Sequence, residues 1–424
     1  MGVRELSPRP LAAAVTAAAC LIAAGCFGDD DDASVTPLPR AVCAPLVQGN
    51  AAPDVIVVSD LPLRGALSPS TKAMAGAVRA TVAAHGFRAG RHSIGFQSCD
   101  DSSAEEGNFT PGRCAASMRA YGENRAVVGV VGPFNSDCAR AQIAIANEAP
   151  DGPLAMISHA NTRTGLTRPA AGAAADEPER YYPRKLRNYA RLPAPEADQV
   201  AEDVRLAKRL GARSMFVLDD DEEYGIQLAR DFRALAPGLG VRVAGSAVWG
   251  EGEATWKRAA RKAAASKADG VYVSGIWQAK GVEMVGELRR ALGNRALLIA
   301  PDGFASLPKD TFASMGGLWV TVPGLPPERY PPSARAVERR FGPGQINSLG
   351  PAYAAQATEV MLDAIGRSDG SRADVTRKLL ATDMRSSVLG PVRFDEGGDL
   401  VGAPISIYRV ARRELRLHDV EVPP

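Results

Sequence analysis

The stretch that most constrains the fold is VVGVVGPFNSDC, at residues 127–138. Its first five residues form an uninterrupted apolar run, which is typical of a strand buried on both faces of a parallel sheet. Gly132-Pro133 ends the run, and Asn135 and Ser136 are residue types that favour a helix start. A strand, a polar turn and a helix N-terminus make a common anion site, because free amide groups point out of the turn. An ordinary connection that binds nothing is the alternative.

The alternation of strand and helix continues on both sides of this stretch. Apolar runs at residues 54–60, 91–98 and 153–158 alternate with helix-like segments, and a second alternating series covers residues 198–304. This rhythm predicts right-handed crossovers and parallel sheets, in which ligands bind at the carboxyl ends of the strands. Because about 370 residues exceed one compact core, we expect two α/β lobes.

The N-terminal segment is predicted to be a targeting sequence. Two arginines precede an apolar run of about 15 residues, which is too short to span a bilayer and suits a signal-peptide core. Small residues directly before Cys26 look like a bacterial lipobox, in which cleavage leaves an acylated cysteine. A plain signal peptide or an uncleaved anchor is the alternative. We therefore expect a signal peptide over residues 1–25 and a flexible tether over residues 26–52.

Composition and motifs argue against several classes of function. A formal net charge of +2 provides no basic field for nucleic acid. No dinucleotide-binding, P-loop, HExxH or GxSxG motif is present, and His159 has no serine or cysteine partner pattern. An exported hydrolase would need such a nucleophile and base, so we predict no catalysis and no cofactor. The acidic run at residues 219–223 lacks EF-hand spacing and is typical of a solvated loop, so we predict no metal site.

Four cysteines remain outside the predicted signal peptide and lipidation site. An even number in an exported chain favours disulfides, with three possible pairings. Because Cys99 and Cys114 bracket a polar loop, we predict that they pair, which leaves Cys43 to pair with Cys138. A metal site is the rival, but neither histidine nor paired CxxC spacing accompanies these cysteines.

An ordered set of motifs resembles the type I periplasmic binding proteins, in the leucine/isoleucine/valine-binding branch that serves ABC importers. The resemblance covers residues 53–411. It is carried by VSDLPLRG at 58–65, CDD at 99–101, VVGVVGPFNS at 127–136, LAMISHANTRTGLTR at 154–168, NYARL at 188–192, LDDDEEYG at 218–225, GVYVSGIW at 270–277, IAPDGFAS at 299–306 and GPVRFDEGGDL at 390–400.

The resemblance implies two Rossmann-like lobes with parallel sheets, joined by three crossover segments. Lobe 1 is expected to contain residues 53–190 and 322–385, and lobe 2 residues 191–321 and 386–424. The ligand is expected in the cleft between the lobes, which close about a hinge on binding.

The resemblance also implies ligand-binding positions on lobe 1. Ser136 and Thr162 are expected to hold the carboxylate of an amino acid, with the backbone of Asn161 contributing. Both side chains follow strand ends, where hydroxyl and amide groups can converge on an anion.

The opposing lobe is expected to supply two aromatic residues and an acid. Tyr224 and Trp277 correspond to positions that stack on the ligand or shape its pocket, and Asp302 to one that pairs with a ligand ammonium group. Each has a structural alternative: Tyr224 could pack beneath its helix, Trp277 could belong to the lobe core, and Asp302 could be a turn residue beside a glycine.

The function implied by the resemblance is that of an extracytoplasmic, lipid-anchored solute-binding protein. It is expected to be a monomer, attached to the membrane only through its lipid. It captures a small polar ligand, a branched-chain or related amino acid, and delivers it to an ABC permease. A ligand-sensing module for a signalling partner is the alternative, and the fold does not separate the two.

Overall fold

The computed structural model describes most of the chain from residue 35 onward. The described residues are Gly2, 35–65, 67–103, 109–171, 173–250, 252–306, 310–342 and 349–423. Ser34–Pro424 forms one compact unit. The predicted lipidation site Cys26 and, apart from Gly2, the predicted signal peptide lie outside the described residues. Among the described helices, none is both long and apolar enough to cross a membrane.

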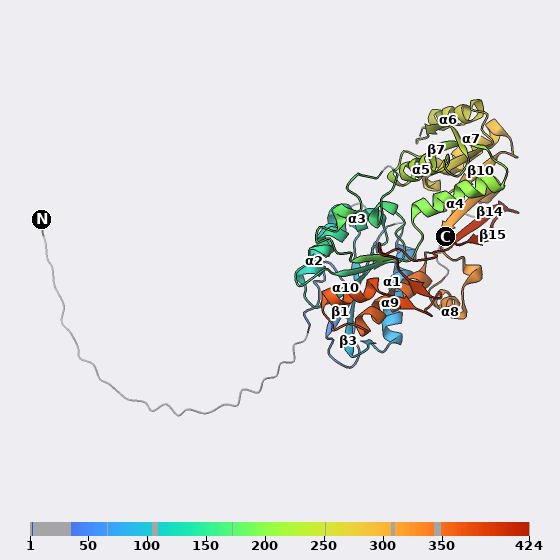
Figure 1. The fold of residues 1–424 in the computed structure, drawn as a ribbon. Coiled ribbons are helices and arrows are strands. Elements are labelled where there is room, and N and C mark those ends of the chain that lie inside the picture. The colour runs from blue at the N-terminus through green and yellow to red at the C-terminus, as the bar shows by residue number, and fades with distance from the viewer. Residues whose placement is uncertain are drawn as a thin grey trace, which may run out of the picture. The chain divides into compact units, whose positions relative to one another are not determined.

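Lobe 1 is built on a six-stranded sheet of order β2-β3-β1-β4-β5-β6. Figure 1 labels β1 and β3 of this sheet. Its strands are β1 (Val55–Leu61), β2 (Arg88–Ala89), β3 (His92–Asp100), β4 (Val127–Val131), β5 (Ala155–Ser158) and β6 (Tyr189–Arg191). All neighbours are parallel except β2, which is antiparallel to β3. Every residue of β1 and β4 is buried, which confirms that these apolar runs are strands covered on both faces.

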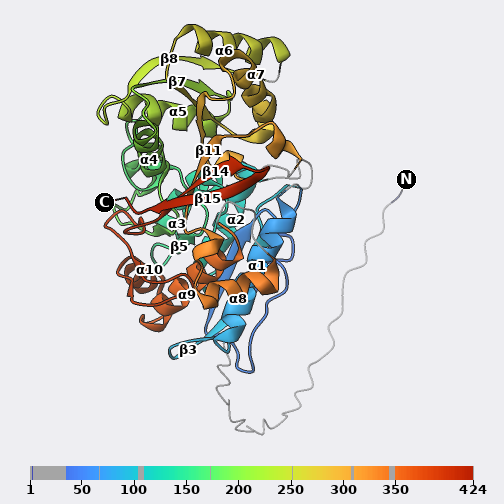
Figure 2. The same ribbon diagram turned by 90° about the vertical axis from the view of Figure 1, so that its right-hand side faces the viewer.

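Helices cover the two faces of this sheet. They are α1 (Ser68–Ala84), α2 (Pro111–Glu123), α3 (Ser136–Asn147), α8 (Pro332–Phe341), α9 (Pro351–Gly366) and α10 (Arg372–Leu380). Successive residues of β1 point to opposite faces, so Val57 belongs to the core under α1 and α9, while Val58 belongs to the core under α2 and α3. Thus α8 and α9, which come from the last quarter of the chain, pack beside α1 (Figure 2).

Lobe 2 is built on a seven-stranded sheet of order β15-β14-β11-β10-β9-β7-β8. Its strands are β7 (Ser214–Asp219), β8 (Arg242–Val248), β9 (Gly270–Ser274), β10 (Leu297–Ala300), β11 (Leu318–Pro323), β14 (Ile405–Ala411) and β15 (Glu414–Glu421). Its helices are α4 (Glu196–Arg209), α5 (Glu223–Leu235), α6 (Glu253–Ala265) and α7 (Val282–Leu292). The strands from β7 to β11 pair in parallel, and β14 and β15 add an antiparallel edge. The predicted α/β fold with parallel sheets is confirmed.

Three crossovers connect the lobes. They follow β6, β11 and the short strand β13 (Val392–Arg393), which pairs with β12 (Asp383–Met384). Val388 and Phe394, on either side of β13, pack in the lobe 1 core.

A buried ion pair joins the first crossover to the third. Arg191, the last residue of β6, is fully buried, and its Nε donates to Oδ1 of Asp399 at 2.7 Å. The backbone N–H of Arg191 also donates to the carbonyl oxygen of Gly398 at 2.9 Å. The two chain segments that pass between the lobes here are therefore held side by side.

The segment predicted as a tether is packed against lobe 1 over much of its length. Leu38 is 4% exposed, and its backbone N–H donates to Oε1 of Gln97 in β3 at 2.7 Å. Cys43 and Val47 form isolated antiparallel bridges to β3. The Pro- and Ala-rich composition suggested a linker, but the buried side chains of Leu38 and Cys43 and the two bridges attach residues 38–47 to β3.

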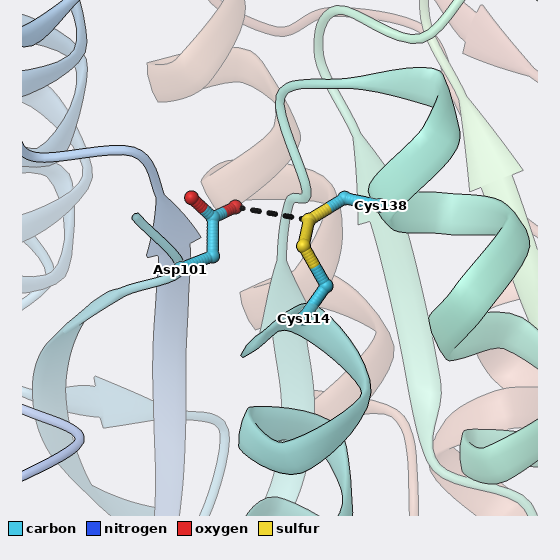
Figure 3. Close-up of side chains that lie close together, drawn as sticks. All are labelled: Asp101, Cys114 and Cys138. Carbon is cyan, nitrogen blue, oxygen red and sulfur yellow. Dashed lines mark hydrogen bonds between the residues drawn. A yellow bond between two sulfur atoms is a disulfide. The ribbon is translucent and has the colours of Figure 1, made fainter. Parts of the chain in front are cut away.

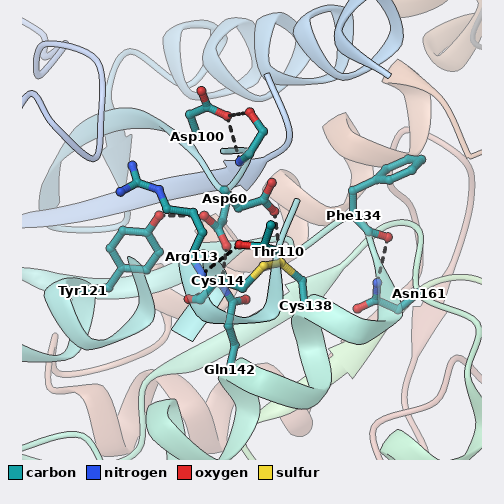
Figure 4. Close-up of a disulfide and its surroundings, with 12 residues drawn as sticks. Asp60, Asp100, Thr110, Arg113, Cys114, Tyr121, Phe134, Cys138, Gln142 and Asn161 are labelled. Carbon is teal, nitrogen blue, oxygen red and sulfur yellow. Dashed lines mark hydrogen bonds between the residues drawn. A yellow bond between two sulfur atoms is a disulfide. The ribbon is translucent and has the colours of Figure 1, made fainter. Parts of the chain in front are cut away.

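Both predicted disulfide pairings are wrong, because the bonds are Cys43–Cys99 and Cys114–Cys138. Figure 4 shows the second of these bonds. Cys43 lies directly opposite Cys99 in the bridge to β3, with 3.9 Å between their Cα atoms. Cys114 begins the packed face of α2, and Cys138 lies in the first turn of α3, the neighbouring helix. Spatial adjacency of the two helices, rather than the polar loop before α2, decides the pairing.

Candidate functional site

The turn after β4 forms part of the wall of a cleft between the two lobes. The cleft has a volume of about 510 Å³ and receives side chains from both lobes, including Ser136 and Thr162 from lobe 1 and Tyr224 and Asp302 from lobe 2. Two larger hollows, of about 700 and 840 Å³, are each lined by a single lobe. Of these three cavities, the 510 Å³ cleft is the one that receives residues from both lobes and would change in volume if the lobes moved about a hinge. We therefore take this cleft as the candidate site.

Ser136 fastens two neighbouring strand ends together. Its Oγ accepts hydrogen bonds from the backbone N–H groups of Thr162 and Arg163, both at 3.3 Å. The N-cap residue of α3, Asn135, has an extended backbone and makes no side-chain capping bond, so the first turn of α3 lacks a side-chain cap. The structure therefore brings Ser136 and Thr162 together, as the sequence predicted, beside the N-terminus of a helix.

Asn161 supports this turn from behind the cleft. Its Nδ2 donates to the carbonyl oxygen of Phe134 at 2.8 Å (Figure 4). Its Oδ1 accepts from the hydroxyl of Tyr189 at 2.9 Å. The side chain is fully buried and does not line the cleft. Its contacts fix the position of Thr162, the next residue.

Glu196 is a cleft residue that the sequence analysis missed. It begins α4, its backbone N–H donates to the carbonyl oxygen of Thr162 at 2.7 Å, and its Oε1 accepts from the Thr162 hydroxyl at 3.1 Å. Burial, followed by repulsion from Asp231, raises the pKa of Glu196 to about 8. An acid in the first turn of a helix is common for electrostatic reasons, so the sequence offered no signal that this one lines a cleft.

Tyr224 and Asp302 form a hydrogen-bonded pair on the lobe 2 wall. The Tyr224 hydroxyl donates to Oδ1 of Asp302 at 2.7 Å, and Nε2 of Gln199 donates to the same oxygen at 2.9 Å. Burial raises the pKa of Asp302. Because both side-chain donors end on Oδ1, the second carboxylate oxygen is available for another donor.

Trp277 does not line the cleft, although its neighbours Ile276 and Gln278 do. The indole is partly buried against the lobe 2 core, and its N–H donates to Oγ of Ser306 at 3.2 Å. Trp277 therefore packs against the core of lobe 2, which was the alternative to a ligand-binding role.

Arg163 connects the lobes across the cleft and was also missed. Its guanidinium contacts Glu177 at 3.4 Å within lobe 1 and Glu223 at 3.0 Å on lobe 2. It immediately follows Thr162, so its position in the turn after β5 was the available signal. The ion pair with Glu223 holds the two lobes together in the structure.

Two further polar features of the sequence have structural contacts. Asp220, within the acidic run at 219–223, accepts hydrogen bonds from the backbone N–H groups of Ile276 at 2.9 Å and Glu222 at 3.2 Å, so it holds two loops together. His159 is fully buried, and burial lowers its pKa to about 4.

A buried acidic cluster lies behind the Ser136 turn. Among the described residues, the one group of side chains close enough to share a metal ion is Asp101 with Cys114 and Cys138 (Figure 3). The two sulfurs are joined in a disulfide and therefore provide no thiolate ligands. Burial and repulsion from Asp60 raise the pKa of Asp101 to about 9, so this carboxyl group is neutral at pH 7.

Comparison with known proteins agrees with this two-lobed architecture. Residues 61–414 match the family model described as periplasmic binding protein. The chain belongs to the periplasmic binding protein family. This is a family of substrate-binding proteins and not of enzymes. No match was found among curated protein sequences.

Solved structures share the fold of this periplasmic binding protein at low sequence identity. A leucine-binding protein from Thermotoga maritima is 20% identical, with a TM-score of 0.67 over 87% of this chain and 99% of that one. A substrate-binding protein from Desulfitobacterium hafniense in complex with leucine is 20% identical, with a TM-score of 0.67 over 86% and 99%. A solute-binding protein from R. palustris in complex with 4-hydroxybenzoate is 16% identical, with a TM-score of 0.66 over 87% and 96%.

Proposed function

We propose that this protein captures a small polar ligand, a branched-chain or related amino acid, in the cleft between its lobes and delivers it to an ABC permease. The observation that carries the proposal is the placement of opposite chemistries on opposite walls. Ser136 and the N-terminus of α3 offer donors on lobe 1, and Asp302 offers a carboxylate on lobe 2. An amino acid carries a carboxylate and an ammonium group and can bridge these two walls. The leucine complex among the related structures supports this ligand class.

The hydrogen bonding of Ser136 suits a ligand carboxylate. Because its Oγ already accepts from two backbone N–H groups, its own hydrogen is directed toward another acceptor. The uncapped amides at the start of α3 add further donors and a favourable helix dipole.

Binding favours closure because the ligand contacts both lobes. A ligand held by Ser136 and Asp302 at once has a higher affinity for the closed form than for the open form, and this difference shifts the equilibrium. Closure then presents both lobes to the permease as one surface.

We also propose that the chain is exported and anchored by a lipid on Cys26. The predicted signal peptide and lipobox support this, and two disulfides suit an oxidising compartment. In this proposal the lipid is the protein's only membrane contact, and the protein acts as a monomer.

The experiment that tests the proposal is a binding assay on the compact unit 34–424. Amino acids are screened by thermal shift, where a ligand at a hundred times its dissociation constant adds about 2.7 kcal/mol of stability. The double variant Ser136→Ala, Thr162→Ala is expected to lose binding while keeping the circular dichroism spectrum of the parent.

A matched double variant controls for general loss of hydroxyl groups. Thr81→Ala with Ser314→Ala removes one threonine and one serine whose hydroxyls donate to backbone carbonyls outside the cleft. It should bind as the parent does. Undiminished affinity in the Ser136, Thr162 variant would contradict the proposed site.

A further inference from the structure

The cleft has an excess of acidic side chains. Five carboxyl groups line it, against one guanidinium, that of Arg163. The five are Asp137, Glu196, Glu222, Glu223 and Asp302. A single zwitterionic amino acid has no net charge and would leave this excess uncompensated.

Arg163 does not offset the excess, because its charge is already matched. Its guanidinium contacts Glu177 and Glu223, which together carry more negative charge than it neutralises. Arg140, which is not among the cleft-lining residues, contacts Asp137 at 3.1 Å and Glu223 at 3.8 Å, so these two carboxylates are the ones with basic partners.

The remaining three carboxyl groups have no basic partner. Among the ion pairs of the described residues, none includes Glu196, Glu222 or Asp302. Glu222 is exposed at the rim, whereas Glu196 is 3% exposed. Because burial raises the pKa of Glu196 to about 8, this carboxyl group is largely neutral at pH 7 in the empty cleft, and a cation placed beside it would favour its charged form.

A second observation also indicates a ligand with many donors. Gln227 lines the cleft, is 3% exposed, and has an Oε1 without a hydrogen-bond partner. Its Nε2 donates to the carbonyl oxygen of Ala171 at 2.7 Å and to Oδ1 of Asp231 at 3.1 Å, which fixes which end of the amide is the acceptor. Among the described residues that line the cleft, the buried side-chain atoms without a partner are two acceptors, Oε1 of Gln227 and Oδ1 of Asn135, and one donor, Nε of Arg163.

We infer that the ligand is a basic amino acid, whose side chain adds a second cationic group, and that Glu196 determines this specificity. Asp302 and Glu196 each receive one of the two cationic groups, and the carboxylate lies at Ser136. The inference rests on the proposed function, since it assigns the ligand of the same cleft. It further predicts that aromatic carboxylates without an amino group are rejected, because they would bring a negative charge to an acidic wall.

The test compares two ligands that differ by one charged group. Lysine and norleucine have the same backbone and nearly the same side-chain length, but only lysine carries a side-chain ammonium group. Isothermal titration of the compact unit 34–424 should give an affinity for lysine at least about tenfold above that for norleucine, or about 1.4 kcal/mol. Arginine against citrulline provides a second pair with the same logic.

Substitution then assigns the preference to Glu196. Glu196→Gln keeps an oxygen that can accept a hydrogen bond from the Thr162 hydroxyl, so this contact is preserved while the carboxyl group is removed. This variant should bring the ratio of lysine to norleucine affinities close to one. Glu283→Gln, a substitution in α7 outside the cleft lining, is the matched control and should leave the ratio unchanged.

The possible outcomes separate this inference from the function it rests on. Binding of leucine or norleucine with equal or higher affinity than lysine overturns the inference and leaves amino-acid capture standing. Binding of 4-hydroxybenzoate alone, or of no amino acid in the panel, overturns both. A lysine preference that survives in Glu196→Gln overturns the role given to Glu196.

Discussion

The ion pair between Arg191 and Asp399 makes a strong prediction about stability. Arg191 is fully buried, and its guanidinium donates to Asp399, to the carbonyl oxygen of Arg163 and to the hydroxyl of Thr167. That hydroxyl in turn donates to Oδ2 of Asp399 at 3.0 Å. Removing the carboxylate would leave a buried positive charge without a counter-charge, which typically destabilises a protein by about 3–5 kcal/mol.

Two substitutions of Asp399 are expected to lower the free energy of unfolding by different amounts within this range of about 3–5 kcal/mol. Asp399→Asn keeps an oxygen for the Nε–H of Arg191 but puts an amide nitrogen where Thr167 needs an acceptor, so we expect a loss of about 3 kcal/mol. Asp399→Ala removes both acceptors, and we expect a loss of about 5 kcal/mol. Urea-induced unfolding of the compact unit 34–424, followed by circular dichroism, measures both.

Two further variants show whether charge burial is the cause. Arg191→Met combined with Asp399→Leu leaves no unpaired charge, so it should be less destabilised than Asp399→Ala alone. Glu414→Gln breaks a pair with Arg416 in which both side chains are about half exposed or more, and should change stability by less than about 1 kcal/mol. A loss below about 1 kcal/mol for Asp399→Ala would refute the reasoning.

Three other predictions concern the buried Asp101, the disulfide Cys114–Cys138 and the proposed lipidation site Cys26. The pKa of Asp101 is raised from 3.8 to about 9, so between these pH values the folded protein keeps a proton on Asp101 that the unfolded chain releases. The free energy of unfolding is therefore highest, as far as Asp101 is concerned, below about pH 4, and it falls as the pH rises toward 9. Asp101→Asn should therefore gain stability over the parent at pH 8 but not at pH 4, by urea unfolding. Replacing Cys114 and Cys138 with alanine removes a disulfide between residues 24 positions apart and should lower the free energy of unfolding by about 3 kcal/mol. An unchanged midpoint of urea unfolding would contradict this. Cys26→Ala should move the protein from the membrane fraction to the soluble fraction after cell lysis; continued membrane association would argue against lipidation.

The position of the site could be predicted because it depends on local sequence patterns and on one topological rule. The apolar run of β4, the polar turn and the start of α3 are adjacent in sequence. Since β4 and β5 are parallel neighbours, their carboxyl ends share one edge of the sheet, and this alone brings Ser136 close to Thr162.

The rest could not be predicted, because it depends on packing between distant segments. Glu196 follows a crossover, and nothing in its neighbourhood shows that α4 will return to Thr162. The disulfides depend on which faces of β3, α2 and α3 meet. Trp277 stands one residue away from two cleft residues, and sequence alone does not indicate which of the three side chains turns toward the lobe core.

The disulfide between Cys43 and Cys99 also determines how mechanical force travels through the chain. When the N-terminal side of Cys43 is pulled, tension passes through the sulfur bridge to Cys99, which lies 56 positions further along the chain, and bypasses the residues between them. That shielded loop contains β1 and α1, which form part of the lobe 1 core. Under such a pull these elements remain unloaded in the oxidised protein, whereas in the reduced protein they are the first to bear the tension.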